Sequence, residues 1–202
     1  MTTELETSEL SLELLGRLNK DTKASAKLLK FQEARFLCDE YYTMQDNRIR
    51  TTNQVRSRLE TTEPNSIISF LANQTAKLEL LIKNSLGIFA AQYRTGQWLQ
   101  SQYGIGPVFS AYFLTNVDIR KAPYAAHFWK FAGITPNSRW NKGETRPWNA
   151  NLKSKCYLMA ETMYKFQSNN NCFYGKYFRK RKDELILQNF QGKFADQNRT
   201  FN

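Results

Sequence analysis

The residues of this chain that could do chemistry are mostly cations, and they are gathered in one segment. The sequence has 202 residues and a formal net charge of +11. Residues 120–182 hold fourteen Lys and Arg against two acids, Glu144 and Glu161, a balance of +12. The whole excess lies in this segment, and such a field favours a polyanionic partner. The cations are Arg120, Lys121, Lys130, Arg139, Lys142, Arg146, Lys153, Lys155, Lys165, Lys176, Arg179, Lys180, Arg181 and Lys182.

A glycine-rich turn, Gly104-Ile105-Gly106-Pro107-Val108, precedes the basic segment. The two glycines allow positive φ and leave the backbone open to a ligand. Pro107 favours the first position of a new helix, whose unpaired N–H groups attract anions. The pattern is typical of a helix-hairpin-helix unit and predicts phosphate binding by Gly104, Ile105, Gly106 and Val108. The alternative is an ordinary turn between two core helices.

Basic and aromatic residues alternate between residues 137 and 149, which we expect to form a loop or a short hairpin. Cations neutralise phosphate, and Trp or Arg side chains stack on exposed bases. The alternative is that the two tryptophans are hydrophobic anchors that pin a long loop. The candidate binding residues are Arg139, Trp140, Lys142, Arg146 and Trp148.

Two later helices extend the predicted basic surface. Residues 150–167 have helical periodicity and place Lys153 and Lys155 opposite an apolar side. Residues 173–191 predict a last helix with a run of cations. A charge run on a helix is usually a solvated face, but this run lies close in sequence to the other basic elements. We therefore include it in the binding surface, as Arg179, Lys180, Arg181 and Lys182.

The chain before the turn predicts a long antiparallel helical hairpin. Residues 23–61 contain no Gly or Pro and carry apolar residues at helical spacing, which predicts one long helix. A second helix, residues 66–93, follows the break at Glu63-Pro64-Asn65. A helix of about forty residues runs ~60 Å, and its apolar residues span more than one seam. We therefore expect a homodimer or higher oligomer through the hairpin.

These elements predict an all-α protein in four parts. A further helix, residues 123–132, is expected to place Phe128, Trp129 and Phe131 in the core. The parts are a short N-terminal helix or tail (1–20), the long, coiled-coil-like hairpin (21–95), a helix-hairpin-helix DNA-binding domain (96–191) and a flexible tail (192–202).

We expect no membrane span, cofactor or metal site. No apolar run approaches the ~20 residues of a membrane helix, and the N-terminus is acidic where a signal peptide is basic. The expected location is therefore the cytoplasm. Cys38, Cys156 and Cys172 form no Cys-x-x-Cys pair. Together with the single histidine, His127, they predict buried thiols rather than a zinc site.

Four motifs occur in order: Gly104-Ile-Gly-Pro, Asp118-Ile-Arg, Phe131-Ala-Gly-Ile-Thr-Pro136 and Gly143…Asn149-Ala-Asn-Leu-Lys153. Together they resemble the C-terminal domain of the insertion-sequence transposases that join a RuvC-like domain to a serine-bearing domain. Short stand-alone relatives carried by phages look closest. The resemblance covers roughly residues 97–185 and implies a DNA-gripping domain in a bacterial or phage-encoded protein. Residues 21–95 are similar to the coiled-coil connector of those enzymes.

The chain departs from that family at the catalytic residues. The family's RuvC-like domain, with four carboxylates for divalent metal, has no room before residue 97, and the acids there lie in a helical hairpin unsuited to a metal cluster. The family's nucleophilic serine falls at Asn141, which cannot take that role. We predict no catalytic residue. Ser138 lies nearby as an alternative nucleophile, against the ordinary role of a serine in a turn.

We therefore expect a DNA-binding protein that lacks complete catalytic machinery, with RNA as the alternative polyanion. Two other functions stay open. One is an active transposase or recombinase subunit with a serine nucleophile, acting with a partner protein or guide RNA in DNA transposition. The other is a phage structural or assembly protein that uses the hairpin for assembly.

Overall fold

The computed structural model describes residues 20–59, 65–136 and 138–196, and its regular elements there are all helical. This confirms the all-α prediction. The N-terminal part, 1–20, lies almost wholly outside the described residues, as does the end of the predicted tail. In chain order the elements are α2 (Lys20–Leu28), α3 (Phe31–Leu59), α4 (Ser66–Ala91), α5 (Arg94–Ser101), α6 (Pro107–Asn116), the 3-10 helix η1 (Ile119–Lys121), α7 (Ala125–Ala132), α8 (Ala150–Lys165) and α9 (Phe173–Phe190).

The chain divides into two compact units that interleave in sequence. The first unit is the chain up to Gln100 together with Gly106–Pro123. The second is Ser101–Ile105 together with the chain from Tyr124 onward. The chain therefore enters the second unit for five residues, and the return crossing falls inside the glycine-rich turn.

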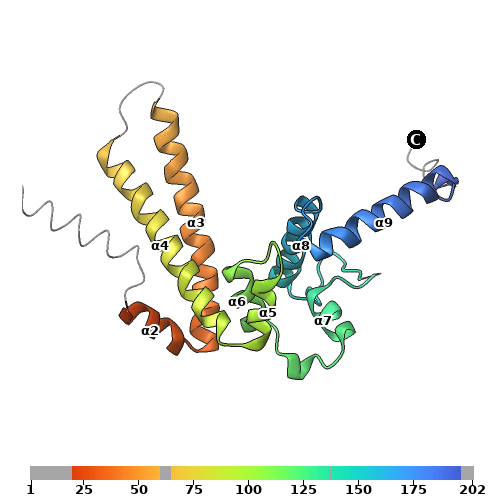
Figure 1. The fold of residues 1–202 in the computed structure, drawn as a ribbon, viewed down its shortest axis with the longest axis horizontal. Coiled ribbons are helices and arrows are strands. Elements are labelled where there is room, and N and C mark those ends of the chain that lie inside the picture. Colours follow the sequence, from red (N-terminus) through yellow and green to blue (C-terminus); the bar gives the residue numbers. More distant parts are fainter. Residues whose placement is uncertain (1–19, 60–64, 137, 197–202) are drawn as a thin grey trace, which may run out of the picture. The chain divides into compact units, whose positions relative to one another are not determined.

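In the first unit, α3 and α4 lie side by side in opposite directions (Figure 1). Phe31 at the start of α3 meets Phe89 near the end of α4, with ring centroids 5.6 Å apart. Midway, Arg48 of α3 pairs with Glu79 of α4. Asn65 begins α4 by accepting a hydrogen bond from the N–H of Ile67 at 2.9 Å, the usual role of an N-cap. The predicted hairpin is thus present.

A polar cluster joins the two long helices halfway along the hairpin. Gln45 Nε2 donates to Glu79 Oε1 at 3.3 Å and to Tyr41 Oη at 3.2 Å, while Arg48 Nε donates to Glu79 Oε2. Partial burial raises the pKa of Glu79, but these hydrogen bonds and the Arg48 charge outweigh it and hold that pKa below its ordinary value. The Glu79 carboxylate therefore stays charged and links α3 to α4 through an ion pair and hydrogen bonds.

The prediction of one unbroken helix over residues 23–61 is wrong, because α2 ends at Leu28 and α3 begins at Phe31. The carboxylate of Glu33 accepts a hydrogen bond from the N–H of Lys30 at 2.7 Å, as in a capping box. Phe31 then packs against Tyr93, with centroids 5.0 Å apart. The break lets α2 pack against α4. Apolar spacing continues across it, so periodicity alone could not show the interruption.

The core of the first unit forms where α6 packs against both α3 and α4. Cys38 of α3, Leu86 and Phe89 of α4, and Ala111 of α6 have no exposed surface. Tyr42 lies against Tyr112 of α6, and burial raises its pKa. This core fixes the start of α6 and thereby the second half of the glycine-rich turn.

In the second unit, α8 packs with both α7 and α9. Its core contains Leu152, Cys156 and Met163 of α8 together with Cys172. All three cysteines of the chain are buried thiols outside any disulfide, as expected. Burial raises the pKa of the Cys156 thiol, which keeps it in the neutral form.

The expected core position of two α7 aromatics is wrong. Trp129 is 49% exposed and Phe131 is 47% exposed, while Phe128 is half-buried. The helix is eight residues long and buries only Ala132 fully, because a short helix packed on one neighbour has little surface to cover. Burial of a large aromatic depends on such a partner, which the apolar pattern does not reveal.

Two further findings hold for the residues that the structure describes. None of their helices combines the length and the apolar character that a membrane crossing requires. No group of three or more His, Cys, Asp or Glu side chains is placed to hold a metal ion.

Candidate nucleic-acid interface

The glycine-rich turn has the local geometry expected from its residues. The N–H of Ile105 donates to the carbonyl of Gln102 at 3.1 Å and closes the turn. Gly104 lies in the left-handed region with φ of +88°, which favours glycine. The next helix, α6, begins at Pro107 with Gly106 as its N-cap. Positive φ is therefore found at Gly104 but not at Gly106, whose φ is −92°, and the helix start at Pro107 is confirmed.

The N-terminus of α6 is open in front of Gly106. A Cβ added there would meet no atom within 4 Å, and Gly106 makes no side-chain cap. Ser110 is the first residue of α6 whose N–H bonds back to Gly106, at 3.1 Å. The N–H groups of Val108 and Phe109 come before this first intrahelical donor, so the helix itself offers them no acceptor. The Val108 side chain is buried, so it offers a ligand only its backbone.

The first half of the turn is fixed to α8 instead. A Cβ on Gly104 would lie 2.8 Å from Thr162 Cγ2, so this glycine serves close packing. Tyr103 meets Phe166 edge-on with centroids 5.3 Å apart, and Asn169 Nδ2 donates to its hydroxyl at 2.8 Å. The buried Ile105 completes this half. Of the fifteen predicted binding residues, Gly106 and Val108 therefore belong to the first unit and thirteen to the second.

The loop between α7 and α8 brings a cation onto an aromatic ring. The guanidinium of Arg146 lies 4.6 Å from the centroid of the Trp140 ring. Trp140 Nε1 donates to the carbonyl of Glu144 at 2.7 Å, and Asn141 Nδ2 donates to the Glu144 carboxylate at 3.2 Å. Trp140 stays 42% exposed. Arg139 and Lys142 are exposed beside it in sequence. These bonds hold Trp140 and Arg146 together at the surface.

Trp148 has a different role and fits the anchor alternative. A Cβ on Gly133 would lie 2.3 Å from Trp148 Cγ, so the indole packs directly on the end of α7. The N–H of Asn149 donates to the carbonyl of Phe131 at 2.9 Å. Lys153 of α8 places its ammonium 4.6 Å from the Trp148 centroid. Trp148 thus joins α7 to α8 and is half-buried.

The cations of the last two helices are less concentrated than the sequence suggests. Lys153 and Lys155 are half-buried on α8, while the α9 cations are exposed. Four consecutive residues at 100° per residue point to all sides of a helix, so the run 179–182 surrounds α9 rather than lining one face. Arg181 donates to Glu184 at 3.2 Å.

Ser138 has the contacts of a turn residue. Its N–H donates to the carbonyl of Thr135 at 3.3 Å, and its hydroxyl shares a hydrogen bond with Thr135 Oγ1. Asn141 lies at the position of the family's serine, and its backbone N–H and side-chain amide both donate hydrogen bonds to the Glu144 carboxylate. These contacts describe a surface turn, and Ser138 as a nucleophile stays a prediction.

A group of exposed aromatic residues at the start of α9 is absent from the binding residues predicted above. Phe173 is 56% exposed, Tyr174 40% and Tyr177 59%. The sequence does carry a signal for them, because these rings directly precede the basic run, and interleaved cations and aromatics are typical of nucleic-acid surfaces. The prediction for this helix named its cations alone.

The candidate interface of the second unit therefore consists of the Trp140–Arg146 pair, the cations around it, and the aromatic and basic helix α9. Comparisons with protein-family models, curated proteins and solved structures find no match to this chain. The resemblance to insertion-sequence transposases thus depends on the sequence motifs alone, and the function has to be argued from this chain's own residues.

Proposed function

We propose that this protein binds DNA through the cations and aromatic side chains of its second unit, with no base-sequence specificity. The observation that supports this proposal most strongly is the net charge of the second unit. From Tyr124 onward the chain holds fourteen Lys and Arg against five acids, a balance of +9. Lys165 pairs with Glu161 at 2.8 Å and Arg181 with Glu184 at 3.2 Å. Five acids cannot neutralise fourteen cations, so the excess charge is available to a polyanion.

The placement of the aromatic rings favours nucleic acid over other polyanions. Arg146 stacked on Trp140 presents a planar cation beside an indole, a pairing that suits phosphate and base together. The open N-terminus of α6 adds a place for a phosphate on the first unit. Phosphate contacts carry no sequence information, which is why we expect binding without base specificity.

Salt dependence tests this proposal. The full chain is titrated against a fluorescein-labelled 25-base-pair duplex, read by anisotropy, between 50 and 300 mM salt. Contact with about six phosphates predicts a loss of about 10³-fold in affinity between 50 and 200 mM. Undetectable binding at 50 mM, or affinity independent of salt, contradicts the proposal.

Charge-matched variants locate the surface. Reversing Arg139, Lys142 and Arg146 to Glu should lower duplex affinity by at least about ten-fold. The slope of log affinity against log salt concentration should become shallower by about 3, because each cation that no longer meets a phosphate reduces its magnitude by about 1. The control reverses Lys27, Arg50 and Lys83, which are exposed on the first unit, and has the same net charge. Equal losses in both triple variants mean that only the overall charge matters, which contradicts the assigned surface.

The proposal includes the absence of a complete catalytic apparatus, and this part has its own test. The chain is incubated with labelled DNA under strand-transfer conditions and analysed on denaturing gels. We expect no covalent adduct. An adduct that forms with the native chain and disappears with Ser138→Ala supports the alternative of an active transposase subunit.

We also propose that a second copy of the chain covers the hairpin. On α4, Ile67, Leu71 and Leu78 recur at spacings of four and seven residues and are 74%, 50% and 41% exposed. Phe70 beside them is 52% exposed. A stripe at this spacing is the seam of a helical dimer, and a contiguous exposed apolar stripe marks an interaction site.

A further inference from the structure

One side of α9 is defined by its contact with α8. Gly175 is buried there, and a Cβ on it would lie 3.0 Å from Cys172 Sγ and 3.1 Å from the carbonyl of Met163. Three residues later, the Phe178 ring lies 4.9 Å from the Tyr164 ring of α8. The side of α9 that carries Gly175 and Phe178 is therefore the packed side. Figure 1 shows the C-terminal half of α9 extending beyond α8.

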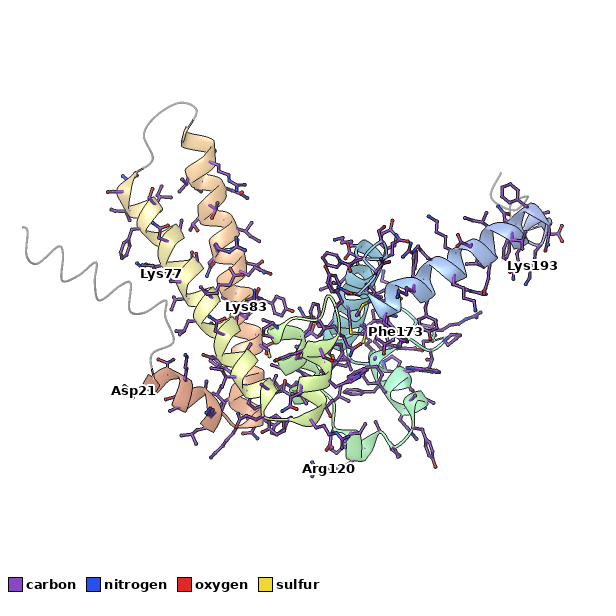
Figure 2. All side chains as sticks on the ribbon, in the orientation of Figure 1. Asp21, Lys77, Lys83, Arg120, Phe173 and Lys193 are labelled. Carbon is purple, nitrogen blue, oxygen red and sulfur yellow. The ribbon has the colours of Figure 1, made fainter. Side chains whose placement is uncertain are left out.

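The opposite side of α9 carries rings and lysines. Glu184 and Leu187 lie on the opposite side of α9 in its second half, where Glu184 pairs with Arg181. In the first half of α9, residues 173–181, four side chains lie within about 50° of the direction opposite Gly175 and Phe178 at 100° per residue. They are Phe173, Lys176, Tyr177 and Lys180, all exposed. Figure 2 labels Phe173 where α9 begins. A packing role on α8 does not explain these residues, because they point away from it.

The two rings on this side, Phe173 and Tyr177, form a cluster with Tyr174, which lies beyond the edge of this side. Phe173 meets Tyr177 with centroids 5.1 Å apart and Tyr174 with centroids 5.2 Å apart, both edge to face. Their exposed fractions of 56%, 59% and 40% are high for aromatic side chains, which usually dominate cores. These exposed fractions leave part of each ring accessible to a flat ligand.

A strand with unpaired bases fits this arrangement better than a duplex. In a duplex the base faces are hidden in the stack, so only cations gain from contact. An unpaired strand offers flat base faces to Phe173 and Tyr177 and phosphates to Lys176 and Lys180. An anionic membrane is a poorer fit, because α9 also carries Arg179 and Lys182 on its other sides and so lacks a continuous apolar face.

We propose that the α9 face formed by Phe173, Lys176, Tyr177 and Lys180 is a stacking platform for the unpaired bases of single-stranded nucleic acid. The inference rests on the proposed function, nucleic-acid binding, and adds the class of ligand. The bases lie on the rings, and the flanking lysines hold the phosphates on either side of them.

The test compares three labelled ligands of equal length at 100 mM salt, by anisotropy with the full chain: a 20-nucleotide dT strand, the matching U strand and a 20-base-pair duplex. We expect either single strand to bind at least about ten-fold tighter than the duplex. The double variant Phe173→Leu/Tyr177→Leu should lose roughly ten-fold or more of single-strand affinity, because stacking is lost at each ring. Duplex affinity should change less than about three-fold.

Tyr157→Leu is the matched control, since Tyr157 is a 63% exposed tyrosine on α8 of the same unit. It should leave all three affinities unchanged, and Tyr177→Phe should keep single-strand binding because the ring face remains. The dT and U arms show whether a 2′-hydroxyl is preferred.

The outcomes separate this inference from the proposed function. Equal affinity for single strands and duplex, or equal losses of both in the double variant, overturns the platform and leaves DNA binding standing. Failure of all three ligands to bind overturns the proposed function itself. The double variant is also tested for binding to phosphatidylserine vesicles. If it loses vesicle binding but keeps its single-strand affinity, the face is assigned to a membrane and the inference is overturned.

Discussion

Gly133 and Gly143, two of the positive-φ glycines of the second unit, have different surroundings. Gly133 has φ of +67° at the C-terminus of α7, and a Cβ there would penetrate the Trp148 ring. Gly143 has φ of +94° in the loop, and a Cβ there would meet nothing within 4 Å. Strain alone applies at Gly143, whereas at Gly133 the strain is combined with a steric clash.

We therefore expect Gly133→Ala to destabilise the second unit by about 2–4 kcal/mol, from about 1 kcal/mol of backbone strain and the cost of displacing an indole. Gly143→Ala should cost only the strain, about 1 kcal/mol. Denaturant unfolding followed by tryptophan fluorescence measures both. Equal losses in the two variants mean that Trp148 does not pack on Gly133 as described.

The conformation or exposure of a single residue can be predicted from the sequence when its cause lies within a few neighbouring residues. The positive φ of Gly104 and the helix start at Pro107 follow from restraints within one or two residues, and both were predicted. The exposure of Trp129 and Phe131 depends on what packs against α7. The pairing of Arg146 with Trp140 similarly requires the loop to fold back at Glu144.

At the element scale, the α3–α4 hairpin should be sensitive to pH through Glu79. The folded pKa of this carboxyl lies below its ordinary value of 4.5, so its contribution is fully present above about pH 4.5. The contribution is lost as pH falls through the lowered folded pKa. Glu79→Gln should cost about 1 kcal/mol at pH 7, because a charged tie to Arg48 is lost.

Urea unfolding at pH 7, 5, 4 and 3 checks this. The native chain and Glu79→Gln should differ at pH 7 and 5 and converge toward pH 3. Arg48→Met should be destabilised at pH 7 and should show a weaker pH dependence than the native chain, because Glu79 still titrates but loses the partner that lowers its pKa most. A stability difference that is constant from pH 7 to pH 3 rules out Glu79 as its source.

The sequence located most helices within a few residues but did not show how they meet. Helical spacing after the break at Glu63-Pro64-Asn65 predicted α4 from residue 66. The interruption at Lys30 arises from a capping bond to Glu33 and from the ring contact of Phe31 with Tyr93. The spacing of Lys30 and Glu33 can be read from the sequence. The contact of Phe31 with Tyr93 joins residues far apart in the sequence, so apolar periodicity does not encode this contact.

At the scale of the whole molecule, the oligomeric state tests the apolar stripe on α4. Light scattering after size exclusion at about 20 µM should give a dimer or higher oligomer for the native chain. Leu71→Glu/Leu78→Glu should give a monomer, because two buried charges cost more than the seam supplies. Leu80→Glu is the control, since Leu80 is 46% exposed on the opposite side of α4.

A native chain that is monomeric at this concentration contradicts the proposed oligomer. Dissociation by Leu80→Glu as readily as by the double variant means that the stripe is not the seam. Circular dichroism at 222 nm shows whether each variant keeps its helices.

The five residues Ser101–Ile105 belong to the second unit, whose other residues begin at Tyr124, more than fifteen positions later. A gene fragment that encodes only the chain from Tyr124 would omit them, and Phe166 and Asn169 would lose Tyr103 as their neighbour. Transfer of this unit alone to another protein, in the laboratory or in evolution, therefore requires two separate pieces of coding sequence. One continuous piece that starts at Ser101 would also carry Gly106–Pro123, which belongs to the first unit.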